Sequence, residues 1–145
     1  MDSPSLQERF APEGRCFGCG PANEHGLRIR SFAAGDGTVE AEWQARPEHE
    51  AFDGFVNGGI LGTLIDCHSN WTAIAALQAA GWAEDAPSTV TSELSVRFRR
   101  PTPSDKPLRL VGRPVEVAPD RVAVETEVVS TSTVSGVFAA STRFA

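Results

Sequence analysis

The sequence predicts a single α+β domain, residues 1–145, in which one long helix packs against five or six antiparallel strands. Two observations lead to this prediction. The glycine-rich and otherwise apolar stretch from Asn57 to Gly81 has the length of one helix, and Gly81 is a natural helix stop. On both sides of it, short runs of alternating apolar and polar residues are separated by Gly, Pro and Asp, which is typical of strands joined by turns.

Composition narrows the class of protein. The chain is 41% hydrophobic and 22% charged, as ordinary globular domains are, and its net charge of −6 argues against a nucleic-acid partner. No apolar run has the length of a membrane span, and the first residues lack the basic start and apolar segment of a signal peptide. We therefore expect a cytoplasmic protein that does not bind membranes.

The segments before the helix begin with residues 1–15, which are expected to be an irregular lead-in with one helical turn around Leu6 to Phe10. Residues 27–33 and 38–45 alternate apolar and polar positions around Ala34-Gly-Asp-Gly, which predicts a hairpin. Residues 46–55 are polar, with Pro and Gly among them, and are expected to form a loop that leads into the helix.

The segments after the helix predict four strands. Residues 89–99 alternate most regularly, with Val90, Leu94, Val96 and Phe98 expected on one face. Residues 108–117, 122–130 and 134–144 supply three more strands joined by short turns. A sheet of this size covers the helix with one face and leaves two edges exposed, so we expect the chain to associate with a second copy.

One face of the predicted helix is small and polar. Seven positions make nearly two helical turns, so Asp66 lies almost directly above Gly59. The same face is expected to carry Gly62, Thr63, Ser69 and Asn70. Glycines at the first turn allow a ligand to approach the free backbone N–H groups at the helix start. The sequence thus places one carboxylate on a glycine-lined stripe.

Three segments together resemble one family. Residues 52–66, Phe-Asp-Gly-Phe-Val-Asn-Gly-Gly-Ile-Leu-Gly-Thr-Leu-Ile-Asp, are similar to a motif of hotdog-fold acyl-CoA thioesterases of the phenylacetyl-CoA thioesterase (PaaI-like) type, usually written HGGxxxTLxD. The strand from Thr89 to Pro101 and the segment from Cys16 to Leu27 resemble the same superfamily. The resemblance implies a hotdog fold, in which a curved antiparallel sheet wraps a long central helix. It also implies a homodimer, or a dimer-based tetramer, with two active sites between protomers.

The resemblance further implies hydrolysis of an acyl-CoA or related thioester, and we expect no cofactor. By this resemblance, Asp66 is expected to act as general base or nucleophile, and the Gly58 backbone N–H of the other protomer to polarise the thioester carbonyl. The resemblance also implies that the hydroxyl of Thr91 helps to place the attacking water. Asn57 stands where the family has histidine, and its amide can hydrogen-bond a carbonyl or cap the helix.

Other residues are candidates for substrate binding, each with a structural alternative. Asn70, one turn beyond Asp66, either orients that carboxylate, contacts substrate or forms an interface hydrogen bond. Gly59, on the same face, is a further candidate for substrate contact. Four aromatic residues either line an acyl pocket or belong to the core: Phe52, Phe55, Trp71 and Trp82. An arginine group either binds the phosphates of coenzyme A or is solvated: Arg97, Arg99, Arg100, Arg109 and Arg113.

The cysteines and histidines are expected to be structural. Cys16 and Cys19 form a CxxCG knuckle that offers half of a zinc site, but no second CxxC or spaced histidine pair completes it, so we expect no metal. Cys67 has no basic partner nearby in sequence and is expected to be an inert, small apolar residue. His68 is expected to be packed or at an interface, because adjacent helical residues point about 100° apart and it cannot face Ser69.

These observations favour a thioester hydrolase. The alternatives are a non-catalytic hotdog module that binds acyl-CoA or an acyl carrier, which the asparagine at position 57 makes credible, and a hotdog hydratase or dehydratase. An interaction module built on the zinc knuckle is a fourth possibility.

Overall fold

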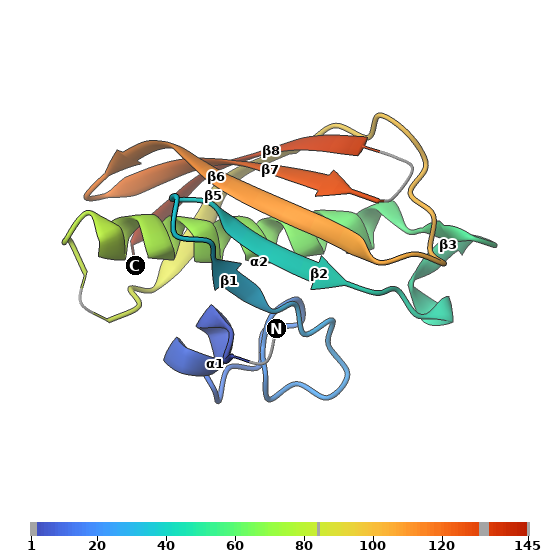
Figure 1. The fold of residues 1–145 in the computed structure, drawn as a ribbon, viewed down its shortest axis with the longest axis horizontal. Coiled ribbons are helices and arrows are strands. Elements are labelled where there is room, and N and C mark those ends of the chain that lie inside the picture. The colour runs from blue at the N-terminus through green and yellow to red at the C-terminus, as the bar shows by residue number, and fades with distance from the viewer. Residues whose placement is uncertain (1–2, 84, 131–133, 145) are drawn as a thin grey trace.

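Helix α2 (Gly58–Ala79) packs along one face of a six-stranded antiparallel sheet within residues 3–83, 85–130 and 134–144, which the computed structural model describes (Figure 1). The helix contacts all six strands. It begins at Asn57, whose side-chain oxygen accepts hydrogen bonds from the N–H groups of Gly59 and Ile60 at 2.8 and 3.2 Å. Gly81, with φ of 78°, takes the left-handed conformation that ends the helical path. The predicted helix and the predicted α+β plan are confirmed.

The strands follow one another out of sequence order in the sheet. The order is β1-β2-β6-β7-β8-β5, and all neighbours are antiparallel. The bounds are β1 (Ser31–Ala33), β2 (Val39–Trp43), β5 (Thr89–Val96), β6 (Leu108–Ala118), β7 (Arg121–Val129) and β8 (Val134–Phe144). Strand β5, which directly follows α2 in the chain, therefore lies at an edge beside the last strand.

Two predictions about the segments before α2 are wrong in detail. The first strand starts only at Ser31, because the N–H groups of Leu27 and Ile29 donate to the carbonyls of Phe17 and Gly18 instead of to a strand. The approach loop contains ordered structure: a 3₁₀ turn, η1 (Pro47–His49), and a small hairpin of β3 (Glu50–Phe52) and β4 (Phe55–Val56).

The main core lies between α2 and the middle of the sheet. Leu64 and Ile65 of the helix pack in one cluster with Leu108, Leu110 and Val128, and each of these side chains is at most 1% exposed. Burying a side chain of this kind contributes roughly 1.5–3 kcal/mol. The apolar face of α2 thus holds the helix against the middle of the sheet.

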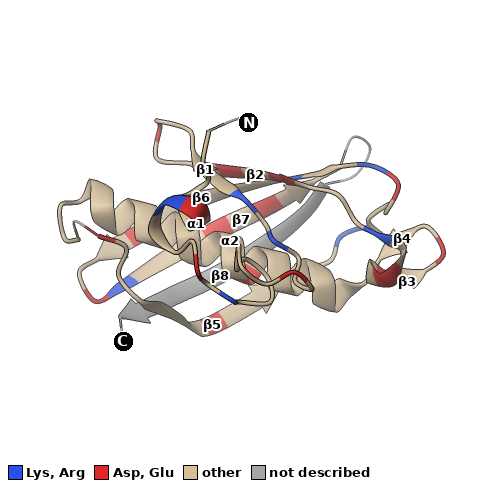
Figure 2. Cartoon of the chain, turned by 90° about the horizontal axis from the view of Figure 1, so that it is seen from below, with Lys and Arg blue, Asp and Glu red and all other residues tan. Residues whose placement is uncertain are grey.

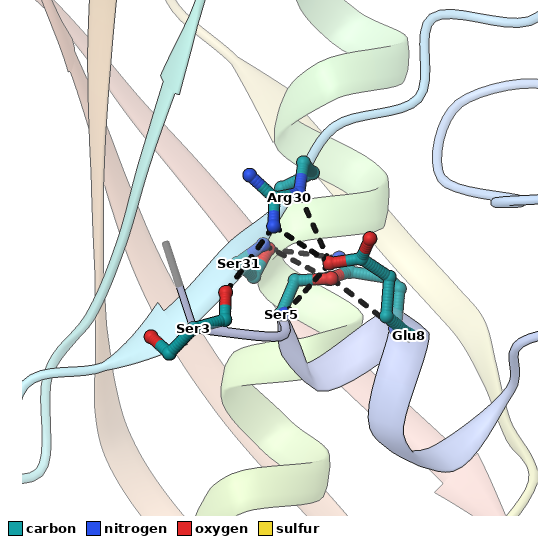
Figure 3. A network of polar contacts seen from close by, with 6 residues as sticks. Ser3, Ser5, Glu8, Arg30 and Ser31 are labelled. Carbon is teal, nitrogen blue, oxygen red and sulfur yellow. Dashed lines mark hydrogen bonds and ion pairs between the residues drawn. The ribbon is translucent and has the colours of Figure 1, made fainter. Parts of the chain in front are cut away.

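The N-terminal segment belongs to the core and is not merely irregular. The predicted turn is helix α1 (Leu6–Phe10), with a capping box between Ser5 and Glu8. Arg30 donates two hydrogen bonds to Glu8 Oε1, at 2.8 and 3.0 Å, and so ties α1 to the start of β1 (Figure 3). Leu6 is only 6% exposed.

A buried polar chain links α1, β1, α2 and β2. The Gln7 amide donates to Ser31 Oγ at 2.9 Å, and Ser31 Oγ contacts His68 Nδ1 at 2.8 Å. The other ring nitrogen of His68 donates to the Val39 carbonyl at 2.8 Å, which leaves Nδ1 to accept from the Ser31 hydroxyl. His68 is completely buried, so the expectation of a packed histidine is confirmed.

Strand β5 exposes a row of apolar side chains. Val90, Leu94 and, just beyond the strand, Phe98 are 54%, 37% and 52% exposed. Acidic and basic segments are interspersed along the rest of the chain, whereas α2 carries Asp66 as its one acidic or basic residue apart from His68 (Figure 2). An edge strand with exposed apolar side chains is a surface that a second chain commonly covers. Among the described residues, no helix has both the length and the apolar character needed to cross a bilayer.

Candidate active site

Asp66 is held by side chains from α2 and β5. Its Oδ1 accepts hydrogen bonds from the Asn70 amide at 3.2 Å and from the Thr91 hydroxyl. Asn70 also donates to Thr91 Oγ1 at 2.9 Å and accepts from the Thr89 hydroxyl at 2.9 Å. Among the described residues, Asp66 Oδ2 has no hydrogen-bond partner. The carboxylate is therefore fixed through one oxygen, and the other is available to a ligand.

A cavity of about 590 Å³ lies in front of this carboxylate. Asp66, Asn70 and Thr91 supply its polar wall. Its apolar wall comes from α1, α2, β5 and the segment before β5, and includes Phe10, Trp71, Ile74, Ala86 and Val90. The structure thus brings together three of the predicted site residues at one polar patch in a largely apolar hollow, a common form of small-molecule site.

The start of α2 faces a different cavity of about 520 Å³. Gly58 lines it, together with Phe52, Phe55, Phe98, Arg99 and Arg100. The Phe98 ring is so close that a Cβ added to Gly58 would lie 3.4 Å from it. Because the Asn57 cap binds the N–H groups of Gly59 and Ile60, the Gly58 N–H is left for a ligand.

Gly58 and Asp66 are too far apart to act on one carbonyl within a protomer. Eight residues of helix separate them by about 12 Å, whereas a hydrogen bond to an oxyanion spans about 3 Å. Each lines a separate cavity. A site that uses both groups therefore requires two protomers.

Several other predicted residues fall outside this arrangement. Ser69, predicted on the polar face with Asp66, is buried, and its hydroxyl lies 2.7 Å from Thr126 Oγ1 of β7. Trp82 and Arg97 are exposed and line neither cavity. Asn57 serves as the helix cap, which is one of the two roles expected for it, and Gly59 is exposed beside it.

The sulfurs of the three cysteines lie close together. Cys16 Sγ lies 3.6 Å from Cys67 Sγ, and the sulfur of Cys19 completes a group within 4.8 Å. The hydrogen bond from Cys67, followed by the backbone N–H groups of Cys19 and Gly18, lowers the pKa of Cys16 to about 5. The same bond, together with burial, raises the pKa of Cys67. Cys67 is buried in the apolar core cluster, as expected of a small apolar residue, but its contact with Cys16 was not predicted, because sequence spacing does not reveal the approach of the knuckle to α2.

Three features of the site have weak sequence signals. Thr89 belongs to the alternating strand but nothing marks it as a partner of Asn70. The Phe98 ring, just beyond the end of β5, contacts Gly58 at the start of α2, and Cys16 of the knuckle contacts Cys67 of α2. Only a contact between segments distant in sequence brings each of them to the site.

A long helix clasped by an antiparallel sheet, with a fixed carboxylate on the helix and a free N–H at its start, defines a hotdog-fold domain. The family model of the thioesterase superfamily matches residues 53–137, and the chain belongs to this superfamily. No curated protein matches the chain.

Solved structures support the assignment. A thioesterase superfamily protein from Shewanella loihica is 31% identical, with a TM-score of 0.67, over 86% of this chain and 97% of the other. The E. coli PaaI protein from the phenylacetic acid degradation operon shares the fold at 14% identity, with a TM-score of 0.68 over 82% of this chain and 80% of its own. A Streptococcus mutans protein bound to acetyl CoA shares it at 17% identity, with a TM-score of 0.67 over 81% and 88%.

Proposed function

We propose that the protein hydrolyses the thioester of an acyl-CoA to a free acid and a thiol. The observation that carries the proposal is the Asp66 carboxylate, which Asn70 and Thr91 hold at the wall of a largely apolar cavity. Membership of the thioesterase superfamily supports this chemistry, and the acetyl CoA in the Streptococcus mutans neighbour supports the substrate class.

The proposed reaction uses Asp66 as general base for a water molecule or as direct nucleophile, through its free Oδ2. Thr91 and Asn70 fix the carboxylate plane so that Oδ2 points away from their hydrogen bonds. The Gly58 N–H of a second protomer stabilises the oxyanion, because the Gly58 of the same protomer is about 12 Å away along the helix. This proton acceptor and this donor together supply what thioester hydrolysis needs.

Release of free thiol from a panel of short, medium, long and aromatic acyl-CoAs tests the proposal. We expect at least one class to be hydrolysed well above the rate without protein. If every acyl-CoA binds and none is hydrolysed, the protein is a binding module, and the proposed hydrolysis is wrong.

We expect the protein to be at least a dimer in solution. The exposed apolar row on β5 and the separation of Gly58 from Asp66 both require a partner. Sedimentation at micromolar concentration checks this. A fully active monomer would contradict the two-protomer site.

Replacing Arg99 and Arg100 with alanine should raise KM while kcat stays nearly constant. Both residues line the cavity at Gly58. We propose that they contact the phosphates of coenzyme A, which they would do in the ground state and the transition state alike. Removing such uniform contacts raises KM alone. The matched control is Arg97→Ala, because Arg97 is exposed but lines neither cavity. If Arg99→Ala, Arg100→Ala and Arg97→Ala all have the KM of the parent, these arginines do not bind coenzyme A and are solvated surface residues.

A further inference from the structure

The three cysteines of the chain converge on one point although the sequence separates them widely. Cys16 and Cys19 lie on the knuckle that precedes β1, whereas Cys67 lies on the buried side of α2, 51 positions after Cys16. All three sulfurs lie within 4.8 Å of one another, and those of Cys16 and Cys67 are 3.6 Å apart.

The spacing of the sulfurs suits a metal ion. In a tetrahedral site with metal–sulfur bonds of about 2.3 Å, two sulfurs lie about 3.8 Å apart. The Cys16–Cys67 separation of 3.6 Å is close to this value and the other two separations are at most 4.8 Å, so small side-chain movements suffice. A disulfide joins two sulfurs at about 2.05 Å and would leave the third cysteine without a role.

We propose that Cys16, Cys19 and Cys67 bind one Zn²⁺ ion as three thiolates, with the fourth coordination position open to the cavity that holds Asp66. Thiolates are soft ligands that favour Zn²⁺, and zinc sites with three protein ligands keep water in the fourth position. All three cysteines line that cavity, and no histidine or carboxylate joins them among the described residues. Two of the three ligands, Cys16 and Cys19, lie outside residues 53–137, the region that the family model matches, whereas Cys67 lies inside it.

The knuckle is built for a close approach to α2. A Cβ on Gly18 would lie 2.4 Å from Cys67 Sγ, and a Cβ on Gly20 would lie 2.4 Å from the Cys16 nitrogen. Gly20 also donates to the Cys16 carbonyl at 2.8 Å, which closes the turn. Only glycine fits at these two positions, and the tight turn is what brings Cys16 and Cys19 onto Cys67.

A metal-binding titration tests the proposal on the full chain. The protein is stripped of metal, reduced and kept without oxygen, and Zn²⁺ is titrated against a competing chromophoric chelator. We expect one Zn²⁺ per chain. With Cd²⁺ as probe, we expect sulfur-to-metal charge-transfer absorption that saturates at one equivalent. Cys16→Ser and Cys67→Ser should each weaken Zn²⁺ affinity at least about 100-fold, because even residues that only support zinc ligands change affinity by about 10- to 100-fold.

A histidine variant serves as the control for the cysteine variants. His25→Ala removes the histidine nearest in sequence to the Cys16–Cys19 knuckle without touching the sulfurs and should bind Zn²⁺ like the parent. Cys16 is exposed, so its serine variant should fold even if that of the buried Cys67 does not. Absence of stoichiometric binding while three free thiols are counted would overturn the proposal, as would full affinity in Cys16→Ser. None of these readouts depends on thioester hydrolysis.

Discussion

Asp66→Asn should lower the rate of thioester hydrolysis by about 10²- to 10⁴-fold, or roughly 3–5 kcal/mol, while the protein stays folded. Asparagine has nearly the same shape and can still accept hydrogen bonds from Thr91 and Asn70 through its oxygen. It cannot take a proton from water or attack a carbonyl as a carboxylate does. Single-turnover and steady-state assays of thiol release, with circular dichroism for folding, measure the effect.

The matched control for this variant is Asp85→Asn. Asp85 is exposed in the segment between α2 and β5 and lines neither cavity, so its loss of charge should leave the rate unchanged. Parental turnover in folded Asp66→Asn would remove Asp66 from the mechanism. The proposed base or nucleophile would then have to be sought elsewhere in the cavity.

The second large effect concerns acid stability, and it arises from His68. Burial lowers the pKa of His68 to about 4, although its bond to the Val39 carbonyl opposes the shift. The usual pKa of a histidine in an unfolded chain is 6.5. The folded state therefore holds the neutral ring, and the unfolded state takes up the proton first as the pH falls. The stability from neutral His68 is fully present above pH 6.5 and is lost between pH 6.5 and about 4.

The expected loss over this window is roughly 3 kcal/mol, since each pH unit of unequal protonation corresponds to about 1.4 kcal/mol. Urea unfolding at a series of pH values measures it. His25→Gln is the control, because His25 is exposed and its removal should leave the slope unchanged. A free energy of unfolding that stays constant between pH 6.5 and 4 in the parent would show that His68 is not held neutral by the fold.

Local signals were sufficient to predict α2 and the strands that follow it. The observed bounds of α2, Gly58–Ala79, agree closely with the prediction of Asn57 to Gly81. The agreement arises because the capping residue and the terminal glycine are local signals that lie within one turn of the helix ends. The strands after α2 match because alternation and turn residues are also local. Asn70 reaches the Asp66 carboxylate because helix periodicity places residues four positions apart on one face, whereas Thr91 joins them from β5, a position that only the family resemblance indicates.

Contacts between distant segments account for what the sequence did not reveal. Ser69 lies 300° around the helix from Asp66, so helix periodicity alone allows it on the polar face. In the fold its hydroxyl is instead hydrogen-bonded to Thr126 of β7, a contact between distant segments. Residues 27–30 alternate like a strand, yet the knuckle takes the hydrogen bonds of Leu27 and Ile29. The same knuckle brings Cys16 to Cys67. No periodicity within one segment carries this information.

The strand order has a consequence for synthesis of the chain. Thr89 of β5 pairs with Phe144 of β8, so β5 leaves the ribosome well before its hydrogen-bond partner exists. In the nascent chain, α2 is therefore present without β6, β7 and β8 to cover it, and the exposed apolar row of β5 lies beside a strand edge that β8 has not yet paired with. Long-range pairing of this kind slows folding and exposes unpaired edges to other chains. The β5 surface proposed to join two folded protomers is thus also the surface that is exposed to aggregation during synthesis.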